Sequence, residues 1–219
     1  DYPELVKQFH PTKNGNLQPQ DFTFGSSKKV WWKCSKGDDH EWETSVHNRT
    51  SKKLGCPFCS NQRVSKTNNL LVNNPKVSSE WHPTKNGNLQ PKDFTLKSGK
   101  KVWWKCPEGD DHEWIVSIAN RGNGHSCPFC SGNKVSKTNS FLTKFPKVAK
   151  EWHPTKNGNL KPENFTDGSG KSVWWKCPKG DDHEWIANIN DRRTDGCPFC
   201  RGKKVSKTNN LLYKFPKVA

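Results

Sequence analysis

Apolar residues recur at a helical spacing in the segment 141–152, at positions i, i+4, i+7 and i+11. These residues are Phe141, Phe145, Val148 and Trp152. Pro146 interrupts the stretch, and proline inside a helix removes a backbone hydrogen bond and clashes with the preceding turn. The pattern therefore predicts two short helical pieces. In the related stretch 67–81, Thr67 and Asn68 are the predicted N-caps and Pro75 the predicted start of a second short helix.

Side chains in "VWWKC" at 102–106 are expected to alternate between the two faces of a strand. Trp104 and Cys106 share one face of a strand, and Trp103 and Lys105 share the other. The segment "HEWIVSIANR" at 112–121 predicts the second strand of a hairpin, whereas 82–95, rich in Pro, Gly and Asn, predicts turns. Trp104 is predicted to be core. For Trp103 two possibilities stay open, packing beneath the helical stripe or stacking against a sugar or base.

These patterns occur three times. "HPTKNGNL" recurs at 10–17, 82–89 and 153–160, and "CPFC" recurs at 56–59, 127–130 and 197–200. The repeat is about 71 residues long, which predicts a tandem array of small units. The expected modules are residues 1–66, 67–137 and 138–207, with 208–219 as the start of a further repeat. An array suits a long, repetitive partner better than it suits a single active site.

Composition limits how such units can be stabilised. Only 30% of the 219 residues are hydrophobic, so each unit is expected to need a metal or disulfides beside its small core. No apolar run is long enough to cross a bilayer, and the start shows no signal-peptide pattern. The chain contains no Met, so we expect it to be part of a longer protein.

Each repeat carries three cysteines and one histidine at matching positions. A C-x5-H pair precedes a CxxC pair by 15, 14 or 13 residues. Three cysteines cannot all pair within one repeat, and this spacing is typical of zinc sites, in which four N and S ligands form a tetrahedron. The predicted ligands are Cys34, His40, Cys56 and Cys59; Cys106, His112, Cys127 and Cys130; and Cys177, His183, Cys197 and Cys200.

Such a closed set leaves no open position for water, so the predicted zinc is structural. The H-x-E and P-C-x-x-C signature of zinc deaminases is not matched, and no catalytic triad or carboxylate pair repeats. We therefore expect no enzyme activity in this chain. The remaining histidines are expected to pack, cap or lie at the surface rather than bind metal. They are His10, His82 and His153 in the "HPTKNGNL" turn, and His47 and His125.

The combination "WWKC…HEW…R…CPFC", preceded by "P-x-V-x-x-EWHPTKNG", resembles the probable zinc-ribbon domains of treble-clef type. The resemblance covers essentially the whole chain, three times. It implies small α+β modules, each a β-hairpin with zinc knuckles and short helices, and it implies nucleic-acid binding, since several members are attached to nuclease-like domains. The chain departs from the family in an extra Asp pair in the first knuckle. These Asp residues are expected to cap the turn or to orient the histidine.

The net charge of the chain indicates the kind of partner that it binds. The formal net charge is +16, and three Cys3His–zinc sites would lower it to about +13, because each adds one negative charge. A strongly basic array favours a polyanion, although solubility alone is an alternative. Basic residues that recur in every copy suit phosphate, which is constant along DNA. They are Lys33, Lys105 and Lys176; Arg49, Arg121 and Arg192; and Lys66, Lys137 and Lys207.

The copies differ most between "HEW" and "CPFC". Short polar side chains there are of the kind that contact base edges. Neutral sequence change on a solvent-exposed strand explains the differences between the copies equally well. The candidate base contacts are Ser45, His47, Asn48, Ser117, Asn120, Asn188, Asn190 and Asp191.

We therefore expect a monomeric, modular zinc-finger array that binds duplex DNA with sequence specificity, as the targeting region of a larger protein and without a membrane partner. An RNA or single-strand binder and a basic protein-interaction scaffold are the alternatives. Metal-bound, reduced cysteines imply an intracellular setting.

Overall fold

The computed structural model describes residues 2–215. The predicted start of a further repeat at 208–219 is described as far as Phe215, and its last four residues lie outside the described part. The chain divides into two compact units, one of 1–105 with 113–125 and the other of 106–112 with 126–219. None of the helices that the structure describes is long and apolar enough to cross a lipid bilayer.

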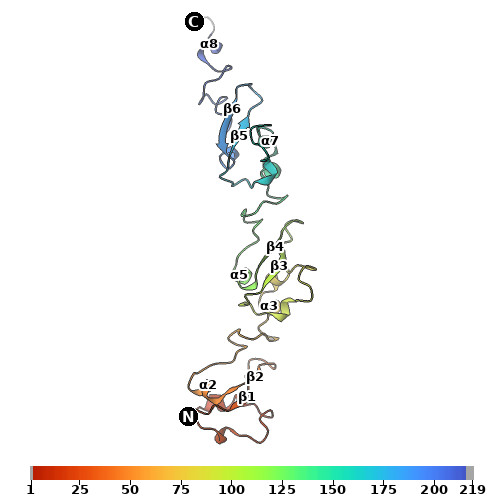
Figure 1. Cartoon of the computed structure of the whole chain (residues 1–219), viewed down its shortest axis with the longest axis vertical. Coiled ribbons are helices and arrows are strands. Elements are labelled where there is room, and N and C mark those ends of the chain that lie inside the picture. The colour runs from red at the N-terminus through yellow and green to blue at the C-terminus, as the bar shows by residue number, and fades with distance from the viewer. Residues whose placement is uncertain (1, 216–219) are drawn as a thin grey trace. The chain divides into compact units, whose positions relative to one another are not determined.

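Each repeat contains one two-stranded antiparallel hairpin (Figure 1). The strands are β1 Lys29–Lys33 and β2 Glu41–Ser45, β3 Lys101–Lys105 and β4 Glu113–Ser117, and β5 Ser172–Lys176 and β6 Glu184–Asn188. In the second repeat Trp104 lies opposite Trp114, and the Trp104 indole N–H donates to the Val116 carbonyl at 3.1 Å. The alternation in "VWWKC" therefore predicted the first strand of every hairpin correctly.

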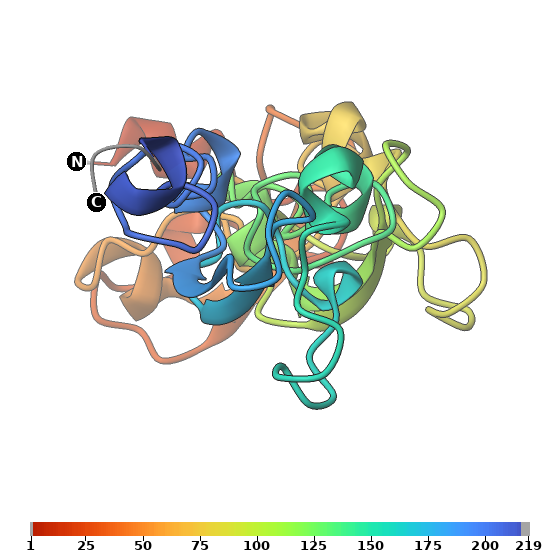
Figure 2. The same ribbon diagram turned by 90° about the horizontal axis from the view of Figure 1, so that it is seen from above.

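Short helices precede and follow each hairpin. Before it lie α1 Pro3–Val6, the pair α3 Leu70–Asn73 and α4 Pro75–Ser78, and the pair α6 Phe141–Lys144 and α7 Pro146–Ala149. The 3-10 helices are η1 Pro19–Asp21, η2 Pro91–Asp93, η3 Pro162–Asn164 and η4 Asp191–Arg193. After the hairpins come α2 Val46–Thr50 and α5 Ile118–Gly122, and α8 Leu211–Lys214 ends the described chain (Figure 2).

The predicted break at Pro146 is confirmed, because α6 ends at Lys144 and α7 begins at Pro146. Pro75 likewise begins α4. The predicted N-caps were wrong by one or two residues. Asn69 caps α3, and its side chain accepts the backbone N–H of Val72. Thr67 and Asn68 instead face the metal site of the preceding repeat, as described below.

The second strand is shorter than predicted. The segment 112–121 was expected to be extended throughout, but β4 ends at Ser117 and α5 begins at Ile118. Ser117 is the helix N-cap, and its hydroxyl accepts the backbone N–H of Asn120. A serine at this position satisfies an otherwise unpaired N–H of the first turn, so the chain turns into a helix there. Ser45 caps α2 in the same way.

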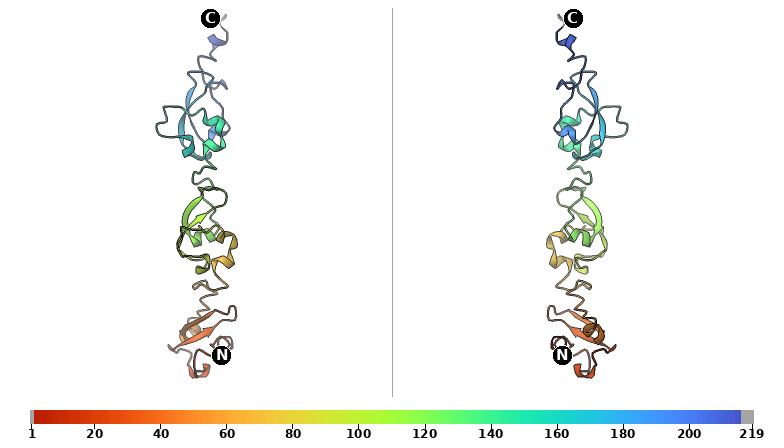
Figure 3. Two further views of the ribbon diagram at one scale, coloured as in Figure 1. Left: turned by 90° about the vertical axis from the view of Figure 1, so that its right-hand side faces the viewer. Right: turned by 90° about the vertical axis from the view of Figure 1, so that its left-hand side faces the viewer.

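The core of each repeat lies between the hairpin and the preceding helices, which Figure 3 shows side by side in the third repeat. Trp175, Phe141 and Ile189 are each 0% exposed. The Phe141 ring meets the Trp175 indole edge-on at 5.7 Å between centroids. Trp104 and Ile118 are also 0% exposed in the second repeat, which confirms the prediction that Trp104 is core.

We predict that Phe141→Ala destabilises the third repeat by about 3–5 kcal/mol, because it leaves a cavity against Trp175. Native-state hydrogen exchange at the Trp175 amide measures the effect without assuming that the three repeats unfold together. The adjacent Leu142 is 42% exposed, so Leu142→Ala is the matched control and should change protection little. Equal effects of the two variants would contradict this packing.

Candidate metal centres

Four ligand atoms converge in each repeat. In the first repeat the Cys34 and Cys59 sulfurs are 3.7 Å apart, and His40 Nδ1 lies 3.8 Å from Cys56 Sγ and 3.7 Å from Cys59 Sγ. Cys34 and His40 lie at the two ends of the turn between β1 and β2, where the Cys34 N–H donates to the His40 carbonyl. Cys56 and Cys59 come from the "CPFC" turn that follows α2.

The same distances recur in the other repeats, between 3.6 and 3.8 Å. A tetrahedral zinc with Zn–S of about 2.3 Å and Zn–N of about 2.0 Å requires ligand atoms roughly 3.5–3.8 Å apart. The three buried Cys3His sites, one per repeat, therefore fit three structural zinc ions. All twelve predicted ligands belong to these three groups.

The chemistry of the donor set also favours a cation. Partial desolvation and the neighbouring thiols raise the pKa of Cys59 to about 12, even though its outer edge reaches solvent. The corresponding shifts also raise the pKa of Cys130 and of Cys200 to about 12. Three thiolates this close together repel one another, so they ionise together only when a divalent cation is bound between them.

A pair of hydroxyls orients each ligand histidine. His40 binds the metal position with Nδ1, and its Nε2 lies 3.0 Å from Ser65 Oγ and 2.8 Å from Thr67 Oγ1. Nε2 carries the proton and donates to these oxygens, which fixes the ring and leaves Nδ1 free for the ion. The matching pairs are Ser136 and Thr138 on His112, and Ser206 and Thr208 on His183.

Sequence reasoning missed these hydroxyls. The available signal was the phrase "SKTN", which follows every CPFC at a similar distance. The second residue of each Asp pair holds the same phrase in place, since Asp39 Oδ2 accepts the Lys66 backbone N–H at 2.7 Å. Asp39 therefore ties down the backbone of the "SKTN" phrase, a role that neither prediction for the Asp pair named, whereas serine and threonine orient the histidine.

Glycine is required beside each ligand histidine. A Cβ on Gly37 would lie 2.7 Å from His40 Nε2, and the same is true of Gly109 beside His112. The other face of the His40 ring stacks on Phe58 of the CPFC turn, with centroids 5.0 Å apart. Each imidazole is thus enclosed by backbone on one side and by an aromatic ring on the other.

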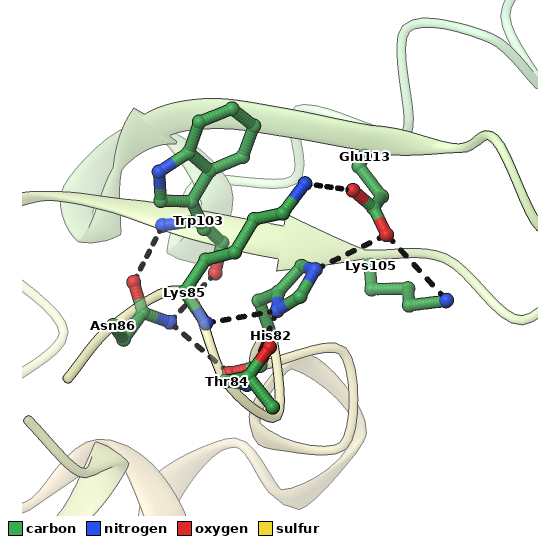
Figure 4. Close-up of polar contacts among 7 residues, drawn as sticks. All are labelled: His82, Thr84, Lys85, Asn86, Trp103, Lys105 and Glu113. Carbon is green, nitrogen blue, oxygen red and sulfur yellow. Dashed lines mark hydrogen bonds and ion pairs between the residues drawn. The ribbon is translucent and has the colours of Figure 1, made fainter.

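The histidine of the "HPTKNGNL" turn belongs to a separate polar cluster, which Figure 4 shows for the second repeat. His82 Nδ1 accepts the backbone N–H groups of Thr84 and Lys85 at 3.2 and 3.1 Å. Its Nε2 lies 3.1 Å from Glu113 Oε1, outside good hydrogen-bonding angles. His10 and His153 have the same environment, and none of the three is among the metal ligands.

Glu113 is the acceptor at the centre of this cluster. Lys85 and Lys105 both reach its carboxylate, and the hydrogen bond from Lys85, followed by the contact with His82, lowers the pKa of Glu113 to about 2. Because the folded-state pKa is depressed, these contacts stabilise the fold above about pH 4, and the stabilisation is lost as the pH falls towards 2. Glu41 and Glu184 have the same shift.

Trp103 lies on the outer face of the hairpin, against the "HPTKNGNL" turn rather than beneath the helical stripe, and its stacking on a sugar or base stays a prediction. Lys85 Nζ lies 4.7 Å above its ring centroid. Asn86 holds the Trp103 backbone at both ends, accepting its N–H at 2.8 Å and donating to its carbonyl at 2.9 Å. The opposite residue on β4, Ile115, is 50% exposed. This face is therefore a partly covered aromatic surface beside two lysines.

The three candidate arginines are buried inside the repeats, which removes them from the predicted phosphate contacts. Arg121 donates to both carboxylate oxygens of Glu80, at 3.0 and 2.6 Å, and to the His125 carbonyl. Arg192 binds Glu151 at 2.6 Å. In the first repeat Gln8 takes the place of the glutamate and accepts a hydrogen bond from Arg49 at 2.6 Å. Burial lowers the pKa of Arg49. The physical reason is that each guanidinium is buried and hydrogen-bonded to Gln8, Glu80 or Glu151, which sequence spacing does not reveal.

The remaining candidate DNA contacts differ in how far their side chains are exposed or already hydrogen-bonded. Ser45 and Ser117 are occupied as N-caps, and Asn188 accepts the Ser172 hydroxyl at 2.6 Å. His47, Asn48 and Asn190 are half-buried. The exposed members are Lys66, Lys137, Lys207, Asn120 and Asp191, and Lys33, Lys105 and Lys176 are partly exposed beside their glutamates.

We predict that the zinc-loaded chain holds three ions and that His112→Ala lowers this to two, because His112 supplies the only nitrogen of the second site. Elemental analysis after gel filtration measures the stoichiometry. His82→Ala and His125→Ala are matched controls, and both should keep three ions. A drop to two in either control would contradict the assignment of ligands.

We further predict that combining Ser136→Ala with Thr138→Val weakens zinc binding at the second site by about 10–100-fold, because His112 Nε2 loses both acceptors. Competition with a chromogenic chelator measures the affinity. Thr84→Val removes an exposed hydroxyl outside the site and should leave all three affinities unchanged. An unchanged affinity in the double variant would show that the hydroxyls do not position the histidine.

Comparison of the sequence with known protein families agrees with this geometry. The family model described as a probable treble clef zinc finger domain matches residues 5–62, 77–133 and 148–203, well over half of the chain. No curated protein matches the sequence. Each matched segment spans one hairpin and one complete Cys3His set. The chain therefore belongs to the probable treble clef zinc finger domain family, as three tandem copies.

Proposed function

We propose that the chain is a modular nucleic-acid-binding array that recognises duplex DNA. The observation that carries this proposal is the formal charge of +16 on three repeats whose backbones are fixed by metal sites. A high positive charge on a repeating chain favours a polyanion with its own repeat, and the phosphate backbone of a duplex is such a partner.

Phosphate contact is assigned to the exposed lysine of each "SKTN" phrase. The backbone N–H of Lys66 is fixed by Asp39 at 2.7 Å, while its side chain is exposed. Lys137 and Lys207 are held identically by Asp111 and Asp182. A lysine with a fixed backbone next to a metal site loses less conformational freedom on binding than one in a flexible loop. The partly exposed Lys33, Lys105 and Lys176 add a second basic position in each repeat.

Base contact is assigned to the first turn of the segment after each hairpin. The varying residues there are His47 and Asn48, Ala119 and Asn120, and Asn190 and Asp191. Ser45 and Ser117 fix where this turn begins in the first two repeats. A constant frame with side chains that differ between repeats would give each repeat its own preference for base edges. The proposed role is binding rather than catalysis.

We predict that affinity for a duplex falls with salt with a log–log slope of about −0.9 per contacted phosphate. Changing Lys66, Lys137 and Lys207 to Gln together should reduce the size of that slope by about three. Fluorescence anisotropy at several salt concentrations measures both quantities. The charge-matched control changes Lys52, Lys76 and Lys147 to Gln, which are exposed lysines outside "SKTN", and its slope should stay close to that of the original chain.

The same assay on single-stranded DNA and on RNA tests the choice of partner. Tighter binding to either of these would replace the duplex proposal, and no binding to any nucleic acid would favour a protein scaffold. Selection from a random duplex pool tests sequence preference. If a site emerges, exchanging residues 47–48 with 119–120 should exchange the corresponding parts of that site.

A further inference from the structure

One of the three cysteine ligands in each repeat is exposed to solvent, and the other two are buried. In the second repeat Cys106 and Cys127 are 5% and 4% exposed, whereas Cys130 is exposed. The exposed member is the second cysteine of CPFC in every repeat, namely Cys59, Cys130 and Cys200. Each metal site thus presents one of its sulfurs to solvent.

The conformation of the CPFC turn is the same around each exposed sulfur. The Ser131 N–H donates to the Cys127 carbonyl at 3.0 Å, so the chain turns directly after Cys130. Gly132 follows with a left-handed φ of 75°, and the equivalent Asn61 and Gly202 have φ values of 62° and 69°. Glycine and asparagine are the residues that adopt this conformation most readily. The exposure therefore follows from a turn that all three repeats share, although their sequences differ after CPFC.

A buried sulfur lies close to each exposed one. Cys130 Sγ is 3.7 Å from Cys106 Sγ, and the same distance separates the sulfurs of Cys59 and Cys34 and those of Cys200 and Cys177. A disulfide bond is about 2.05 Å long, so the two sulfurs need to approach each other by only about 1.7 Å. Each repeat therefore holds an exposed sulfur with a second sulfur positioned to react with it.

Metal binding keeps these ligands in their reactive form. Cysteine binds a metal as the thiolate, and the thiolate rather than the thiol is the nucleophile that peroxides oxidise. Susceptibility to oxidation follows thiolate character and exposure. Cys130 combines both properties, whereas Cys106 and Cys127 are covered by the repeat.

We propose that the exposed cysteine of each repeat is a site of reversible oxidation by hydrogen peroxide, closing a disulfide within its own repeat and releasing the metal ion. The disulfides are Cys34–Cys59, Cys106–Cys130 and Cys177–Cys200. This reactivity belongs to the metal sites and does not depend on which polymer the chain binds.

The reaction has two steps. The Cys130 thiolate attacks one oxygen of hydrogen peroxide, the O–O bond breaks and hydroxide leaves, which forms a sulfenic acid on Cys130. The Cys106 thiolate then attacks the Cys130 sulfur, an S–S bond forms, and the S–O bond breaks with loss of a second hydroxide. Two thiolates thus lose two electrons, and one peroxide is reduced to two hydroxide ions.

The disulfide removes two of the four ligands. Cys127 and His112 remain, and a structural zinc site needs four ligands, so the ion is no longer held. The new bond still joins the turn after β3 to the CPFC turn, as the metal did. Reduction of the disulfide therefore returns the two thiolates to positions beside Cys127 and His112, where zinc binds again.

Treatment of the zinc-loaded chain with hydrogen peroxide tests the proposal, with released zinc followed by a chromogenic chelator. Up to three ions per chain should be released, and peptide mapping should find the three proposed disulfides. A thiol reductant with added zinc should restore the bound ions. Absence of release, or release with the exposed cysteines in other disulfides, would overturn the proposal.

Brief alkylation with iodoacetamide, stopped at low conversion, tests whether exposure selects the reacting cysteine. Mass spectrometry should find Cys59, Cys130 and Cys200 labelled about tenfold or more faster than the six buried cysteines. The buried cysteines are matched controls, because they bind the same ions. Equal labelling rates would contradict the assigned sites.

Cys130→His supplies the comparison within one chain. The variant keeps four N and S ligands at the second site but has no exposed thiolate there, and elemental analysis measures whether it retains three ions. Peroxide should then release two ions at the original rate and the third about tenfold more slowly. Release of all three at the original rate would overturn the proposal. A variant that holds only two ions leaves the decision to the disulfide mapping of the original chain.

Discussion

The structure depends on placing three cysteine sulfurs and one imidazole nitrogen around one divalent ion in every repeat. Each repeat has a core of one hairpin face and a few short helices, the longest of five residues, and helices this short are not stable in isolation. The metal joins the turn at the end of the hairpin to the CPFC turn, which are far apart in sequence. Because the ion binds the folded repeat and not the unfolded chain, its binding free energy adds to the stability of so small an apolar core.

The metal site is also continuous with the joint between repeats. Asn68 donates to the Phe58 carbonyl of the CPFC turn at 2.5 Å, and the next residue, Asn69, caps α3 of the following repeat. Leu70 then enters the core of that following repeat. The four residues Ser65 to Asn68 thus belong to one metal site, and Asn69 and Leu70 to the next core. The residues that contact the first metal site are therefore followed directly by residues that pack in the next repeat.

Much of this could be predicted from sequence, because zinc ligands and strand faces depend on local spacing. The Cys and His positions, the first strand of each hairpin and the buried Trp104 follow from such spacing. The end of the second strand did not, since Ile118 fits the buried phase of a strand as well as the first position of a helix. Ser117 was the available signal, because serine is a preferred N-cap residue. In the structure its hydroxyl accepts the N–H of Asn120 and the helix begins at Ile118. The hydroxyl partners of His40 depend on how the chain folds back, which spacing alone does not show.

Basic residues that recur in every repeat do so for two different physical reasons, and the arginines and lysines illustrate one each. Arg121 is buried inside its repeat and pairs with Glu80, so its constancy reflects packing. The lysine of "SKTN" recurs at an exposed position where only its backbone is bound, and packing gives no reason for a charged side chain there. The variable residues show the converse. The positions that vary lie just after the Ser45 and Ser117 caps, where the fold fixes the start of the turn while the side chains differ between repeats. A partner that contacts every repeat would therefore meet the same exposed lysine in each one, together with side chains that differ between the repeats.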